Sequence, residues 1–102
     1  MSYTITMINT EEPKPNQVMF GFFQPDGTAV SGMKNTIKDK SLTDNEVLQE
    51  SINFMYNLKE NSQLPDVDGL VITIRYKNFF QAYRKDEDDN LVDIQRQDSV
   101  LH

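Results

Sequence analysis

The sequence predicts an α+β fold: an antiparallel sheet of about five to six strands with one α-helix packed on one face. Six short segments are rich in alternating or β-branched apolar residues, and a single segment has apolar residues at helical spacing. In chain order they read β-β-β-α-β-β-β, and one helix across an antiparallel sheet is the simplest way to bury both apolar surfaces. A chain of 102 residues suits one hydrophobic core, so we predict a single domain over residues 1–102.

The first predicted strand is residues 2–8, SYTITMI. Tyr3, Ile5 and Met7 fall on one side of this segment, and serine and threonines fall on the other. This period of two is typical of a strand with one buried face. Residues 9–16 follow it with two prolines and several charged residues, and we predict a linker there.

A β-hairpin is predicted next. Residues 17–23 (QVMFGFF) form its first strand, and the QPDG at 24–27 supplies residues suited to a tight turn. Residues 28–32 (TAVSG) return as its second strand. Residues 32–41 are mostly polar and are predicted to be a loop.

The helix is predicted over residues 43–61. Thr43 and Glu46 have the spacing of a capping box, and Leu42 and Val47 have the spacing of a hydrophobic staple. One side of the segment carries the residues expected to face the core, namely Val47, Leu48, Ser51, Ile52, Phe54, Met55 and Leu58. The helix should end before Pro65.

Three further strands are predicted over residues 70–77, 79–85 and 91–97. The first has the strongest alternating, β-branched pattern in the chain. Possible turns at residues 77–78 and 86–90 separate the three segments, so they are expected to form a meander.

The most conspicuous motif is Phe20-Gly21-Phe22. It resembles part of the aromatic strand of the RNA-recognition motif, whose core alternates glycine with aromatic residues. Val18 and Met19 stand in place of that family's basic-glycine pair, and Pro25 stands in place of the last aromatic residue. That family also places this strand after its first helix, whereas here it precedes the helix. We therefore interpret the motif as a hairpin strand in which Gly21 lets a neighbouring group approach closely.

Few side chains suited to catalysis are present. The chain has no cysteine, and its single histidine is His102, so Cys–His and Ser–His–Asp catalysis and thiolate or multi-histidine metal sites are excluded. It also lacks a phosphate-binding loop, a dinucleotide fingerprint and a nucleophile elbow. We predict that the protein is not an enzyme and uses no cofactor, and we assign no catalytic or cofactor-binding residue.

A calcium-binding interpretation of the acidic segment near residue 88 also fails. Asp86, Asp88 and Asn90 have the spacing of the first EF-hand ligands, but Leu91 stands where that loop needs glycine and Gln97 where it needs glutamate. No helices are predicted beside the segment. We predict an exposed hairpin tip and no metal site.

The net charge of −6 lies mainly in the middle of the chain. Residues 41–68 contain six acidic residues and one lysine, which leaves −5. An acidic protein lacks the basic surface that binds phosphates, so direct binding to nucleic acid is not expected. No segment has the length and hydrophobicity of a membrane span, and the first residues lack the basic start of a signal peptide. We therefore expect a cytoplasmic location and no membrane contact.

Two functions fit these observations. The first is a protein–protein interaction or assembly module, with itself as a possible partner through the sheet face. The second is an acidic inhibitor that mimics nucleic acid and docks on a basic surface of a nucleic-acid enzyme; it resembles such inhibitors in size and charge only. The predicted partner-binding residues are Phe20, Phe22 and Phe23 for the apolar contact and Asp44, Glu46 and Glu50 for the acidic one.

Overall fold

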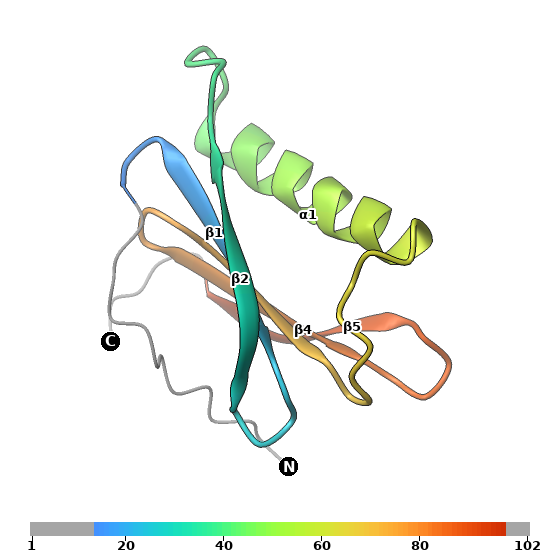
Figure 1. Ribbon diagram of the computed structural model, residues 1–102. Helices are drawn as coiled ribbons and strands as arrows, with labels where there is room; N and C mark the ends of the chain where they lie inside the picture. Colours follow the sequence, from blue (N-terminus) through green and yellow to red (C-terminus); the bar gives the residue numbers. More distant parts are fainter. Residues whose placement is uncertain (1–13, 98–102) are drawn as a thin grey trace.

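One five-stranded antiparallel sheet and one helix make up residues 14–97, the part of the chain that the computed structural model describes (Figure 1). The elements are β1 (Gln17–Phe23), β2 (Ala29–Thr36), α1 (Asp44–Glu60), β3 (Val71–Tyr76), β4 (Phe79–Lys85) and β5 (Leu91–Gln97). The strands lie in the order β2-β1-β3-β4-β5. The α+β class is therefore as predicted. The first predicted strand, residues 2–8, lies outside the described residues, so five of the six expected strands are seen.

β1 and β2 form the predicted hairpin. The turn is closed by hydrogen bonds from the Gln24 amide to the Thr28 carbonyl (2.8 Å) and from the Gly27 amide to the Gln24 carbonyl (2.9 Å). Gly27 has a φ of 93°, which glycine adopts at little cost. The Asp26 carboxylate accepts a hydrogen bond from the Thr28 amide (2.9 Å), so both arms are held at the tip.

β2 is longer than the sequence predicted. A loop was expected from residue 32, but the strand continues to Thr36 and stays in register with β1, from Phe22 opposite Ser31 to Gln17 opposite Thr36. The prediction was wrong here because pairing with β1 overrides a weak local preference. Polar residues are tolerated because β2 lies at an edge of the described sheet and most of its side chains are exposed.

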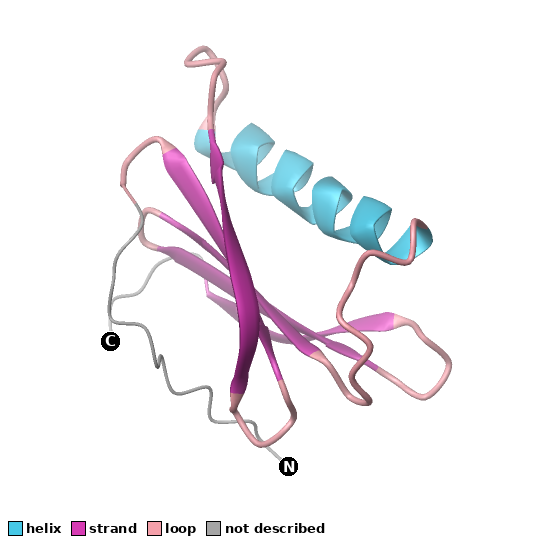
Figure 2. Cartoon of the chain, in the orientation of Figure 1, coloured by secondary structure: helices cyan, strands magenta, loops and turns pink. Residues whose placement is uncertain are grey.

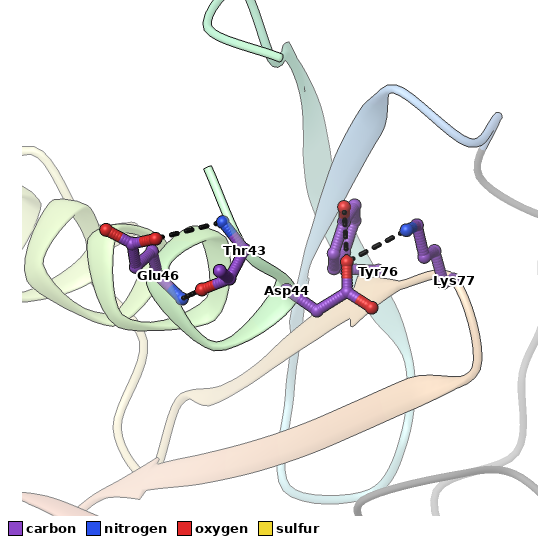
Figure 3. Close-up of polar contacts among 5 residues, drawn as sticks. All are labelled: Thr43, Asp44, Glu46, Tyr76 and Lys77. Atoms are coloured by element: carbon purple, nitrogen blue, oxygen red, sulfur yellow. Dashed lines mark hydrogen bonds and ion pairs between the residues drawn. The ribbon is translucent and has the colours of Figure 1, made fainter. Parts of the chain in front are cut away.

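α1 begins and ends with well-formed caps. The Thr43 hydroxyl accepts from the Glu46 amide (3.2 Å), and the Glu46 carboxylate accepts from the Thr43 amide (3.0 Å), which confirms the predicted capping box (Figure 3). At the other end Ser62 adopts a φ of 57° and its amide donates to the Lys59 carbonyl (3.1 Å). The Gln63 amide reaches the Leu58 carbonyl (2.8 Å), and together these bonds make a Schellman motif.

The core lies between α1 and one face of the sheet, which we call the inner face (Figure 2). Phe20 packs against Phe54 of the helix with ring centroids 5.4 Å apart. Ser51, the one buried polar residue of α1, donates its hydroxyl to the Val47 carbonyl (2.8 Å) and so needs no other partner. The sheet contributes Val18, Phe20, Phe22, Ile72, Ile74 and Tyr76, and the helix contributes Val47, Leu48, Met55 and Leu58.

The opposite face of the sheet, which we call the outer face, is also apolar at its centre. Its central residues, which alternate with the inner-face residues along β1, β3 and β4, are Phe23, Val71, Thr73, Phe80 and Ala82. Gly21 lies beneath the Phe23 ring, because a Cβ atom there would sit 2.7 Å from that ring and 2.6 Å from the Thr73 hydroxyl. The expected close approach at Gly21 is thus confirmed.

β3, β4 and β5 form the expected meander. Lys77 turns the chain between β3 and β4 with a φ of 53°, and the acidic tip closes with a hydrogen bond from the Asp86 amide to the Asn90 carbonyl (2.9 Å). The β4–β5 ladder is interrupted: Ala82 lies opposite Gln95 and Tyr83 opposite Asp93, so residue 94 is an extra residue in β5.

Candidate functional site

The structure separates the three phenylalanines that the sequence assigned to a partner surface. Phe20 and Phe22 point to the inner face and are 3% exposed each, beneath α1. Phe23 points to the outer face and is 9% exposed. A partner could reach Phe20 or Phe22 only if the helix moved, so these two residues lie in the hydrophobic core and not on a surface.

Two of the three predicted acidic residues take part in local structure. The Asp44 carboxylate accepts from the Lys77 ammonium (2.8 Å) and the Tyr76 hydroxyl (3.2 Å), which joins the start of α1 to the turn after β3 (Figure 3). The hydrogen bond from Lys77 holds the pKa of Asp44 below its usual value, and the bond from Asp44 raises the pKa of Lys77. Glu46 has a lowered pKa because the Thr43 amide donates to its carboxylate.

Glu50 is the remaining predicted residue, and it lies beside a hollow. This β2–α1 hollow has a volume of about 330 Å³ and lies between the end of β2, the loop that follows it and the first half of α1. Its apolar lining residues include Val18, Val47 and Phe54, and its charged ones are Lys38, Asp39 and Glu50. The hollow is therefore lined by both apolar and charged side chains.

β2 lies at one edge of the described sheet, so only one of its sides is paired with another strand of that sheet. Most of its side chains are exposed. Val30, which is 39% exposed, is among the most exposed large apolar residues within residues 14–97. The Ile37 amide donates to the Asn16 carbonyl (2.8 Å) at the end of the β1–β2 ladder. In an antiparallel ladder, every second residue of a strand forms its backbone hydrogen bonds with the same neighbouring strand. Ser31, Met33 and Asn35 therefore bond to β1.

The alternate residues of β2, such as Gly32 and Thr36, direct their backbone groups away from β1. Lys34 is the one charged residue in the strand, and there is no proline. An edge of this kind presents hydrogen-bonding groups to which another strand can be added. Sequence reasoning missed this site because residues 32–36 were predicted to be a loop.

The other edge of the described sheet is less suited to pairing. The extra residue at position 94 divides β5, so that it is regular only over residues 91–93 and 95–97. β2 also contains a bulge, at Val30, but its remaining residues 31–36 are paired without interruption. Since a bulge disturbs the spacing of backbone groups, a long regular ladder can form on β2 and not on β5.

Other kinds of site are not indicated within residues 14–97. No group of three or more potential metal-ligating side chains is present in this part of the chain. Its one helix, α1, is too short and too polar to cross a lipid bilayer. Comparisons of the chain with protein-family models, with curated proteins and with solved structures found no match.

Proposed function

We propose that the protein is a non-catalytic assembly module that forms a homodimer by antiparallel pairing of β2 with β2 of a second copy. The accessible, regular edge of β2 is the observation that carries this proposal. Pairing would satisfy the outward backbone groups of both strands and would join two five-stranded sheets into one. The sheet faces are less suited, because Phe20 and Phe22 are covered by α1 and the central outer-face residues are buried.

The pattern of β2 favours one register. When Met33 lies on the two-fold axis opposite Met33 of the second copy, Gly32 lies opposite Lys34 and Val30 opposite Thr36. This register uses the outward groups of the whole strand and keeps the two Lys34 ammonium groups from lying directly opposite each other, which would be destabilising. The two Met33 side chains would meet on the inner side of the joined sheet, so that each loses exposed apolar surface.

Cross-linking tests the register, because the natural chain has no cysteine. Directly opposite residues that do not bond to each other lie about 4.5 Å apart at Cα, close to the range a disulfide spans. We expect Met33→Cys to form a covalent dimer under mild oxidation. Ser31→Cys is the matched control on the same side of the same strand: two copies of residue 31 would be roughly 13 Å apart, too far for a disulfide.

Removing one backbone donor tests the pairing itself. Gly32→Pro and Gly32→Ala both add a Cβ atom, which meets the Phe20 carbonyl at 3.1 Å, but only proline lacks the outward N–H. Light scattering at micromolar concentration should show a dimer for the natural chain and for Gly32→Ala, and a folded monomer for Gly32→Pro. A natural chain that stays monomeric at high micromolar concentration would contradict the proposal.

An acidic inhibitor is the second candidate function. It is supported by the charge of residues 41–68 and by the exposure of Glu50 and Glu60. The acidic surface available for docking is smaller than the sequence indicated. Asp44 is engaged in an ion pair, and Glu46 is engaged in the helix cap. Binding through these carboxylates would weaken steeply with added salt, whereas backbone pairing at β2 would change little. Salt dependence therefore separates the two functions.

A further inference from the structure

We infer that the outer face of the sheet is a docking surface for the chain's own N-terminal residues 2–8. The central outer-face residues, Phe23, Val71, Thr73, Phe80 and Ala82, are between 0% and 9% exposed. α1 is the one helix within residues 14–97, and it packs on the inner face. A sheet covered on one side leaves its other face accessible to water, so burial at this level requires a second cover.

A turn directly precedes β1. The Gln17 amide donates to the Lys14 carbonyl (2.9 Å), which closes a turn with Pro15 at its second position. The chain that leads up to β1 therefore reverses direction at this point. The six steps from Lys14 back to residue 8 can extend over roughly 20 Å. β4 lies two strand spacings from β1, about 10 Å, so residues 2–8 can reach across the outer face to β4.

The segment and the surface match in hydrophobicity. Tyr3, Ile5 and Met7 alternate with polar residues, so an extended segment presents one apolar side over seven residues. The outer face offers apolar residues on three adjacent strands, from Phe23 on β1 to Phe80 on β4. Contact between the two would remove both apolar surfaces from water.

The charges match as well. One row across the outer face, at the end where β1 begins, consists of Lys34, Met19 and Arg75. Its two charged residues are basic, and we call it the basic row. Glu11 and Glu12 precede Lys14 by only three and two positions, so this end of the sheet is within their reach. Attraction between these carboxylates and the basic row would guide the segment to the outer face and away from the acidic helix.

Paramagnetic relaxation measured by NMR on the full chain tests this inference. A nitroxide attached at Ser2→Cys is the only label, since no other cysteine is present. We expect strong broadening of the Thr73 and Ala82 signals and little at Asn53 and Tyr56, which lie on the exposed side of α1. Broadening confined to β2 would place the segment at the sheet edge, and uniform weak broadening would leave it undocked; either result would overturn the inference.

Paired substitutions show whether the apolar side of the segment is responsible. Ile5→Asp should abolish the broadening at Ala82 and expose the outer face, seen as increased binding of a hydrophobic dye. Thr6→Asp adds the same charge on the polar side and should leave both readouts unchanged. A mixture of nitroxide-labelled chains with isotope-labelled, nitroxide-free chains should show no broadening at Ala82. Broadening in that mixture would mean that a second copy supplies the segment, and it would contradict docking within one chain.

Discussion

Ser62 ends α1 in a left-handed conformation that glycine adopts more readily than serine. Its φ of 57° completes the Schellman motif, in which the Gln63 amide bonds to the Leu58 carbonyl. A residue with a Cβ atom in this region is strained by roughly 1–2 kcal/mol. Sequence reasoning placed the end of the helix only by Pro65, because the usual glycine signal is missing at this position.

Replacing Ser62 by glycine should therefore stabilise the protein. The relief of strain exceeds the additional chain entropy that glycine has when unfolded, roughly 0.5–1 kcal/mol, so we expect a net gain of about 0.5–1 kcal/mol in the free energy of unfolding. Urea unfolding of Ser62→Gly measures it. Asn61→Gly is the neighbouring control: Asn61 has a φ of −91°, so no strain is relieved and stability should fall. Equal effects at both positions would contradict this account.

At the scale of elements, α1 and its first turn were the most predictable part of the fold. The capping box and the apolar spacing are local signals, and each residue type acts on neighbours three or four positions away. The length of β2 and the burial of Phe20 and Phe22 depend on pairing and packing between distant segments. The sequence placed these aromatics in a strand but carried no information on which face of that strand α1 would cover.

The capping box should contribute measurably to stability. Thr43→Ala removes the acceptor for the Glu46 amide and should lower the free energy of unfolding by about 1 kcal/mol. Thr43→Ser keeps the hydroxyl and should retain most of this stability. Denaturant midpoints of the two variants provide the comparison. If serine and alanine were equally destabilising, the methyl group of Thr43 and not its hydroxyl would be the important feature.

At the scale of the whole molecule, hydrogen-bonded carboxylates make stability depend on pH. Asp26, Asp39, Asp44 and Glu46 all have pKa values lowered by hydrogen bonds, from the usual 3.8 for aspartate and 4.5 for glutamate. A carboxyl group whose pKa is lower in the folded state stabilises the fold above its unfolded pKa. This stabilisation is lost as the pH falls through the folded pKa. Stability should therefore be complete above about pH 5 and decrease below about pH 4.

Asp44 should account for part of this decrease. In Asp44→Asn the free energy of unfolding should fall less between pH 7 and pH 3 than in the natural chain, because the group that gains a proton is absent. Lys77→Met removes the main cause of the lowered Asp44 pKa and should flatten the same curve. Urea midpoints at both pH values measure the effect. Between pH 7 and pH 3, the free energy of unfolding of the double variant should change no less than that of Asp44→Asn alone. If the effects of the two substitutions on this change were additive, the two side chains would act separately.

The extra residue in β5 bears on how many chains can join. An edge that pairs with the opposite edge of the next copy repeats without limit and produces a fibre, whereas an edge that pairs with itself about a two-fold axis closes at two copies. In the proposed dimer both ends of the joined sheet are β5 strands, each divided at residue 94 and each carrying the exposed, charged Asp93. Irregular, charged ends of this kind resist further addition of strands. In the proposed dimer, the bulge in β5 would therefore limit assembly to two copies.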